Sequence, residues 1–97
     1  MTAASKQQIR QWFKEGKNAG YDFMIVCCDT FDWEDFPVYT KRGIEGFKTE
    51  YKRVMSNRIM EVYDLNMDLE MQMGERRAFH YPKGFSRIAL LREVQTS

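Results

Sequence analysis

The chain has 97 residues and a mass of 11.6 kDa, and its 15 basic and 14 acidic side chains leave a net charge of +1. This length supports one domain with a single hydrophobic core, and the near-neutral balance argues against a strongly cationic nucleic-acid binder. With 43% hydrophobic and 30% charged residues, the composition is that of a globular protein and excludes a disordered or collagen-like chain.

Neither a membrane span nor a disulfide framework is predicted. The longest apolar run, Phe23 to Cys28, is far shorter than the roughly 20 residues that cross a bilayer, and the N-terminus lacks the apolar core of a signal peptide. Cys27 and Cys28 are adjacent, which is too close for an unstrained disulfide. We therefore expect reduced thiols, a cytoplasmic location and no membrane partner.

The first elements in chain order are a helix and a buried strand. Ser5 and Gln8 have the spacing of a capping box, and the apolar residues that follow repeat at helical spacing, which predicts a helix over about 5–18. Residues 21–28 are rich in aromatic and β-branched side chains without a polar alternation. They predict a central strand that is buried on both faces.

An acidic loop over 29–35 is expected to connect this strand to a second one in a hairpin. Pro37 is predicted to open the second strand, residues 38–40, because proline is tolerated at a strand start but cannot donate within a ladder. From Gly43 the apolar period becomes helical, with Phe47 and other apolar residues on one face and basic residues on the other. This pattern predicts an amphipathic surface helix.

The second half of the chain is less regular. Residues 59–65 fit both helical and strand spacing, and we favour a strand. Asn66 or Asp68 is predicted to cap a further helix that extends to about Arg77. Residues 88–94 predict a last short helix or strand.

This order of elements predicts a single α+β domain over residues 1–97. Its core would be one small, mainly antiparallel sheet with the helices packed on one face. Residues 84–97 are left open as a peripheral tail. A sheet this small has exposed edges, which proteins either protect or use for pairing, so we expect a homo-oligomer.

Charge alternates in blocks along the chain. The net charges are +3, −5, +4, −5 and +4 for residues 1–20, 21–40, 41–58, 59–75 and 76–97. Such blocks can pair within one molecule or across an interface between copies.

The densest chemical feature is the run from Cys28 to Pro37, in which four acids alternate with three aromatic residues. The acids could hold a divalent cation, the aromatic residues could anchor a partner, or the run could simply cap turns and cover the core edge. It lacks the register of a calcium loop, so no metal ligand is assigned. We predict a partner-binding surface formed by Asp29, Asp32, Trp33, Glu34, Asp35 and Phe36.

A basic and aromatic segment follows, with no acid between Glu75 and Glu93. This composition can stack on rings and neutralise phosphates, although the signatures of RNA-binding modules and of phosphate loops are missing. The same segment could instead pair with the acidic loop of its own or a neighbouring subunit. We predict that Arg76, Arg77, His80 and Tyr81 contact an anionic ligand or partner.

The sequence offers one candidate nucleophilic pair, which we do not favour. Cys28 and His80, the only histidine, could form a thiolate–imidazole pair. A cysteine in an apolar strand has a raised pKa, however, and no nucleophile elbow accompanies it. We therefore predict no catalytic residue, no metal ligand and no cofactor.

The run from Cys28 to Tyr39, C-D-T-F-D-W-E-D-F-P-V-Y, and the segment Met60 to Leu65 carry a resemblance. They resemble small proteins of unassigned function encoded by tailed bacteriophages and prophages, over about residues 10–81. The resemblance implies a viral origin, a compact accessory role and a location in the host cytoplasm. It assigns no site residue.

The expected function is therefore non-enzymatic: a bacteriophage accessory protein that binds a host protein or sequesters a small anionic, nucleotide-like ligand. The alternative is a small metal-dependent enzyme that processes a nucleotide or phosphoester. It would use Asp29, Asp32 and Asp35 near the metal and Arg76 or Arg77 on phosphate. Nucleic acid is a less favoured partner, because the net charge is so low.

Overall fold

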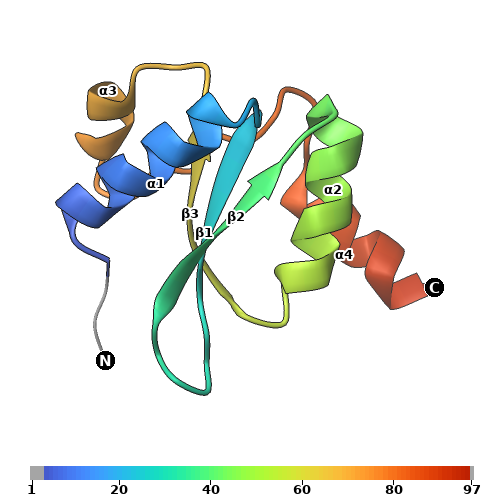
Figure 1. Cartoon of the computed structure of the whole chain (residues 1–97). Coiled ribbons are helices and arrows are strands. Elements are labelled where there is room, and N and C mark those ends of the chain that lie inside the picture. The colour runs from blue at the N-terminus through green and yellow to red at the C-terminus, as the bar shows by residue number, and fades with distance from the viewer. Residues whose placement is uncertain (1–3, 97) are drawn as a thin grey trace.

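A three-stranded antiparallel sheet lies between helices in the computed structural model, which describes residues 4–96 (Figure 1). The strand order is β2-β1-β3, and both pairings are antiparallel. This confirms the α+β class and the antiparallel sheet. In chain order the elements are α1 (Lys6–Asn18), β1 (Phe23–Cys28), β2 (Asp35–Thr40), α2 (Gly43–Val54), β3 (Arg58–Asp64), α3 (Leu69–Met73) and α4 (Arg87–Thr96).

β1 is the centre of the molecule, and all six of its residues are buried. Successive side chains of a strand point to opposite faces. Ile25 and Cys27 join the cluster of apolar side chains on the α2 side, whereas Met24 and Val26 join the cluster on the α1 side. The unbroken apolar run in the sequence therefore reflects burial on both faces, as predicted.

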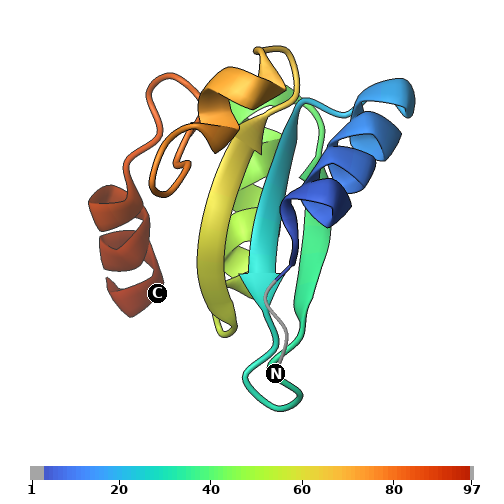
Figure 2. The same ribbon diagram turned by 90° about the vertical axis from the view of Figure 1, so that its left-hand side faces the viewer.

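The helices cover both faces of the sheet, so the prediction that they pack on one face is wrong. α1 contributes Ile9 and Phe13 to one cluster, and α2 contributes Phe47 and Tyr51 to the other. Figure 2 shows the sheet between α1 and α2. The reason lies in β1, because a strand without a polar face exposes apolar area unless both sides are covered.

Most predicted elements are confirmed, with shifts at their ends. The Ser5 side chain accepts a hydrogen bond from the Gln8 backbone N–H at 3.1 Å and so caps α1. Residues 58–64 form a strand, and the last element is a helix. α3 is capped by Asp68 but stops before Gly74, short of the predicted end at Arg77.

The two sheet edges are protected in different ways. At β3, the Val62 N–H donates to the Ala78 carbonyl at 2.8 Å and the His80 N–H donates to the Val62 carbonyl at 2.9 Å. At β2, the register directs the backbone nitrogen of Pro37 away from β1. Pro37 lies inside the strand and not at its start, and its missing N–H removes one donor from that edge.

α4 packs against α2 through one buried side chain and an ion pair network. Leu90 is 1% exposed and belongs to the cluster on the α2 side, although it lies in the segment left open as a tail. Glu93 lies 3.8 Å from the Lys48 ammonium and 3.6 Å from that of Lys52. Among the described residues, no helix is long and apolar enough to cross a membrane.

A substitution at Gly46 would test the close contact between the start of α2 and the chain that precedes it. A Cβ at this position would lie 1.5 Å from the Lys41 carbonyl oxygen, which is backbone and cannot rotate away. We expect Gly46→Ala to lower the free energy of unfolding by about 3 kcal/mol in urea titrations, as overpacking does.

Gly74→Ala is the matched control. A Cβ there would make ordinary contacts at 3.4 Å, and the helical φ of −71° suits alanine. Its effect should be a stabilisation of about 0.4–1 kcal/mol. Equal losses for the two variants would contradict the packing described for α2.

Candidate anion-binding pocket

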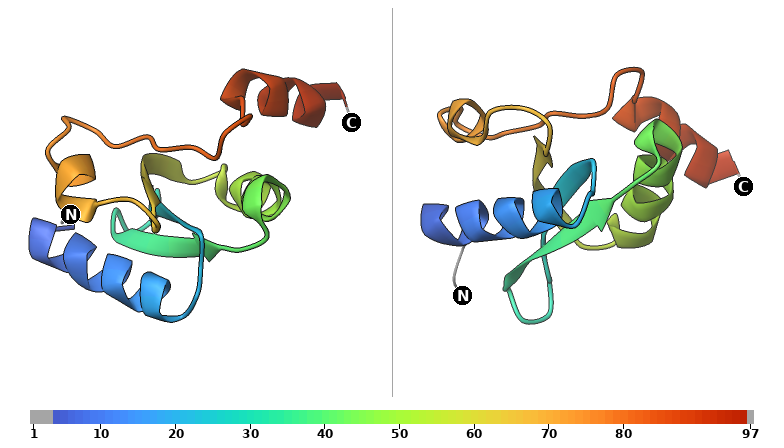
Figure 3. Two further views of the ribbon diagram at one scale, coloured as in Figure 1. Left: turned by 90° about the horizontal axis from the view of Figure 1, so that it is seen from above. Right: turned by 45° about the horizontal axis from the view of Figure 1, so that its top comes forward.

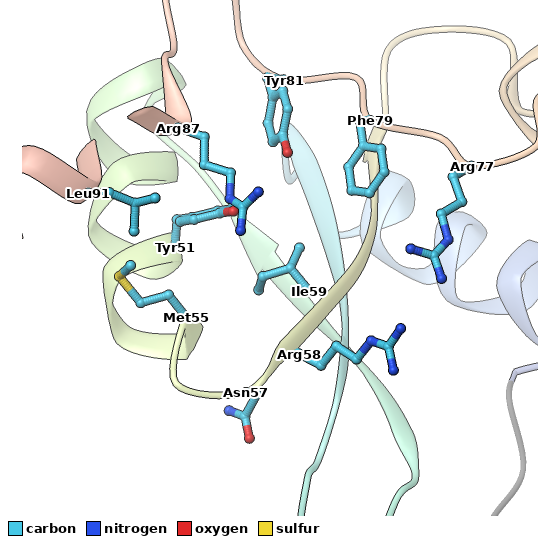
Figure 4. A pocket seen from close by; sticks show the side chains of 10 residues that line it. All are labelled: Tyr51, Met55, Asn57, Arg58, Ile59, Arg77, Phe79, Tyr81, Arg87 and Leu91. Atoms are coloured by element: carbon cyan, nitrogen blue, oxygen red, sulfur yellow. The ribbon is translucent and has the colours of Figure 1, made fainter. Parts of the chain in front are cut away.

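A cavity of about 580 Å³ opens beside β3, between the C-terminal end of α2, the start of α4 and the chain that follows α3 (Figure 4). Figure 3 shows that chain running from α3 past β3 to α4. We call this cavity the arginine pocket. It is lined by Tyr51, Met55, Asn57, Arg58, Ile59, Arg77, Phe79, Tyr81, Arg87 and Leu91.

The chain after α3 supplies one wall of the arginine pocket through strand-like alternation. Phe79 pairs with Val62 in a parallel bridge, so its side chain lies on the α2 side of the sheet. Arg77 and Tyr81, two residues away in either direction, share that side and line the pocket. Ala78 points the opposite way, into the cluster on the α1 side.

The alternation divides the predicted basic segment. Arg77 and Tyr81 line the pocket, whereas Arg76 and His80 are not among its lining residues. His80 instead has its ring Nε2 atom 2.9 Å from a Glu75 carboxylate oxygen. Two of the four predicted ligand-binding residues therefore line the pocket, and the other two lie outside it.

The arginine pocket carries positive charge without a neutralising partner. Its lining includes Arg58, Arg77 and Arg87 and no acidic residue. None of the three forms an ion pair with another described residue. Other arginines of the chain are paired, such as Arg10 with Glu70 at 2.9 Å. Three unpaired guanidinium groups around one cavity are suited to an anion.

Aromatic rings form the apolar part of the same wall. The Phe79 and Tyr81 rings stack with centroids 6.0 Å apart, and Tyr81 also contacts Phe85 with centroids 5.0 Å apart. Phe79 remains 40% exposed. The pocket therefore offers a ring surface next to its cations.

The Tyr81 hydroxyl of the pocket stays protonated at neutral pH. Burial is the main cause that raises the pKa of Tyr81, and the neighbouring Tyr51 raises it further. The positive charge of Arg87 acts in the opposite direction and lowers it. A protonated hydroxyl can donate a hydrogen bond to an anion.

The acidic loop forms the tip of the β1–β2 hairpin, over residues 29–34, and lies outside the arginine pocket. A carboxylate oxygen of Asp29 accepts hydrogen bonds from the backbone N–H groups of Phe31 at 2.7 Å and Asp32 at 3.4 Å. Phe31 is 88% exposed and Trp33 is 45% exposed. Trp33 also has a φ of 60°, which is costly for a bulky residue.

The six residues of the predicted partner-binding surface do not all lie together in the structure. Asp29, Asp32, Trp33 and Glu34 belong to the hairpin tip. Asp35 instead accepts a hydrogen bond from the Ala4 N–H at 2.8 Å, and Phe36 packs against the cluster on the α2 side. Among residues 4–96, no three histidine, cysteine or acidic side chains gather in a way that could hold a metal ion.

The structure keeps Cys28 and His80 apart. Cys28 pairs with Arg58 at the start of β3, whereas His80 is bonded to Val62, four residues further along that strand. Burial raises the pKa of Cys28, and the nearby Asp35 raises it further. Burial also raises the pKa of Cys27 to about 12. Neither thiol is activated as a nucleophile.

Another cavity, of about 440 Å³, lies at the start of α2 and has mixed charge. Lys41 and Arg42 line it together with Glu45 and Glu50. The Lys41 ammonium lies 4.5 Å from the Tyr21 ring centroid and so already has a partner. This cavity is therefore a weaker site for an anion than the arginine pocket.

Sequence reasoning missed several pocket residues. The spacing of Arg77, Phe79 and Tyr81 is a period-two signal that could have placed Phe79 in the site. Arg87 lies in the same acid-free segment as Arg77, whereas Arg58 comes from the start of β3 and has no local signal that links it to them. Comparisons of this chain with protein-family models, curated proteins and solved structures found no match.

The burial of both thiols predicts their reactivity. Cys27 is 0% exposed and Cys28 6%. In a thiol titration with Ellman's reagent at neutral pH, we expect the native protein to react only slowly and the denatured protein to release both thiols at once. Rapid reaction of one thiol in the native protein would contradict the buried position.

Cys27 also predicts a loss of stability at alkaline pH. Its pKa is about 12 in the folded chain against an ordinary value of 9.0, so between these values the folded state binds more protons than the unfolded state. The free energy of unfolding should therefore fall as pH rises above about 9, by roughly 1–2 kcal/mol at pH 10.5. Urea titrations of the wild type and Cys27→Ala should show a steeper fall in the wild type; parallel curves would argue against the shift.

Proposed function

We propose that this chain is a non-enzymatic binding protein that sequesters a small ligand in the arginine pocket. The ligand carries an anionic group and a flat ring, as a nucleotide does. The observation that carries the proposal is the set of three arginines without an ion pair among the described residues, placed around a cavity with an aromatic wall.

Charge supports the anionic part of the ligand. The guanidinium groups of Arg58, Arg77 and Arg87 repel one another, and no acid of the lining offsets them. A phosphate or carboxylate would reduce this repulsion and accept paired hydrogen bonds from the planar groups. Asn57 and the tyrosine hydroxyls add further donors.

The aromatic wall supports the ring. Phe79 and Tyr81 stack with an interplanar angle of 24°, and Phe79 keeps an open face. Stacking of a base on an aromatic side chain contributes about 1–3 kcal/mol. An anionic ligand that carries a flat heterocycle should therefore bind this pocket more tightly than a sugar phosphate without one.

The chemistry of the lining supports binding without conversion. A general base or a nucleophile would be expected within hydrogen-bond reach of the ligand, yet the lining holds no acid, histidine or cysteine. The metal-dependent alternative relied on Asp29, Asp32 and Asp35, which lie outside the pocket. It therefore lacks a link between its acids and its phosphate site.

The resemblance to small bacteriophage proteins fits this role. An accessory protein that acts in the host cytoplasm can change a host process by removing a small molecule, and it needs no catalytic group to do so. The proposal therefore combines viral origin, cytoplasmic location and ligand capture in one function.

Arg77→Gln tests the proposal, with Arg76→Gln as the matched control. The two variants change the same charge at neighbouring positions, but only Arg77 lines the pocket. Titration calorimetry should use adenosine 5′-monophosphate, ribose 5-phosphate and inorganic phosphate as probes. We expect the nucleotide to bind the wild type most tightly, and Arg77→Gln to weaken it about tenfold, since a charged hydrogen bond is worth about 1.5–3 kcal/mol.

Arg76→Gln should leave the affinity within about twofold of the wild type, because long-range charge effects at the surface are screened. An equal loss in both variants would mean that the probe senses only net charge. Absence of heat for all three probes with the wild type would overturn the proposed function.

A further inference from the structure

We propose that the acidic hairpin tip of one copy docks into the arginine pocket of a second copy, with Phe31 and Trp33 against the aromatic wall. This inference rests on the proposed function in one respect only: both require an open, positively charged pocket. It adds an interaction between copies and makes the tip the natural competitor of the anionic ligand.

The hairpin tip has the features of a docking element. Two large aromatic side chains are exposed on it, Phe31 by 88% and Trp33 by 45%. Exposed aromatic residues of this size are typical of contact surfaces. Asp29, Asp32 and Glu34 surround them, so a partner must offer an apolar surface together with positive charge.

The tip is also held in a fixed conformation before any partner arrives. The Asp29 carboxylate accepts two backbone hydrogen bonds within the tip, and the Trp33 N–H donates to the Asp29 carbonyl at 2.7 Å. The Asp29 N–H in turn donates to the Glu34 carbonyl at 2.9 Å. Docking such a loop costs little ordering entropy.

The arginine pocket is complementary to the tip in both charge and chemistry. The three acids of the tip match the number of unpaired arginines in the lining, Arg58, Arg77 and Arg87. The exposed ring of Phe79 offers the apolar contact that Phe31 and Trp33 lack in the isolated chain. Arginine and aromatic side chains are the residues most enriched in interface hot spots.

The tip does not enter the pocket of its own molecule in this structure. Cys28 is paired with Asp35 on one side and with Arg58 on the other, so the hairpin is tied into the sheet up to its last turn. Figures 1 and 2 show the loop projecting beyond the end of the strands, away from the helices. The proposed occupant is therefore the tip of another copy.

The free edges of the sheet offer no equal route to self-association. Pro37 removes a donor from the outer edge of β2, and residues 78–80 cover part of the edge of β3. Association through the sheet edges is therefore less favoured than docking of the tip into the pocket.

The test is the mass of the protein in solution, measured by sedimentation velocity at sub-millimolar protein. We expect the wild type to exceed the 11.6 kDa of one chain at low salt. A tip variant, Phe31→Ala with Trp33→Gly, should be at least tenfold weaker in self-association. Glycine adopts the φ of 60° at position 33 without strain, so this variant keeps its fold. Met71→Ala, which removes an exposed apolar side chain on α3, is the matched control and should behave as the wild type.

Mixing two variants tests the pairing directly. The tip variant keeps an intact pocket, and Arg77→Glu keeps an intact tip; each alone should be monomeric, and an equimolar mixture should form a species of twice the monomer mass. Trp33 fluorescence in a Trp12→Phe background should change only when the pocket partner is added.

A monomeric wild type, or tip and pocket variants that still associate as the wild type does, would overturn the inference. The two proposals fail separately. If the tip variant binds adenosine 5′-monophosphate while the wild type is monomeric, only the docking is wrong; if copies associate but no probe displaces them, only the ligand assignment is wrong.

Discussion

Both faces of β1 are buried, and the other strands and the helices are arranged around that burial. Because every side chain of this strand is apolar or a thiol, each face needs a cover, and two pairs of helices provide it. The same burial raises the pKa of Cys27, so its thiol is a poor nucleophile at neutral pH. It also requires a strand on each side to satisfy the backbone of β1, which is why so short a chain builds a sheet with β1 at its centre.

The arginine pocket exists because the edge of β3 is covered only in part. The chain after α3 contacts β3 at Val62 and then departs toward α4, and it pairs with no residue nearer the start of the strand. The space between these elements holds a cavity, which is lined by side chains from four parts of the chain. A complete fourth strand would have placed Phe79 and Tyr81 in a closed core; the departing chain leaves Phe79 with an open face.

The fold places the alternating charge blocks of the sequence on separate surfaces. Acids of the second block project at the hairpin tip, while arginines from the third and fifth blocks meet at the pocket. A net charge near zero therefore conceals two surfaces of opposite sign, each with exposed aromatic rings. That separation is what links capture of an anion to association between copies in the proposals above.

The sequence predicts the class of the fold, the position of nearly every element and the central place of β1, since apolar period, capping residues and proline act over a few neighbouring residues. It also singled out Arg77 and Tyr81 and the exposed tip at Trp33. The period-two alternation of residues 76–81 already separates Arg76 and His80 from Arg77 and Tyr81. The sequence does not show that the helices occupy both faces of the sheet, or that Arg58 joins Arg77 and Arg87 around one pocket. These two facts depend on which side of a strand faces which helix and on contacts between distant segments, and no local pattern encodes them.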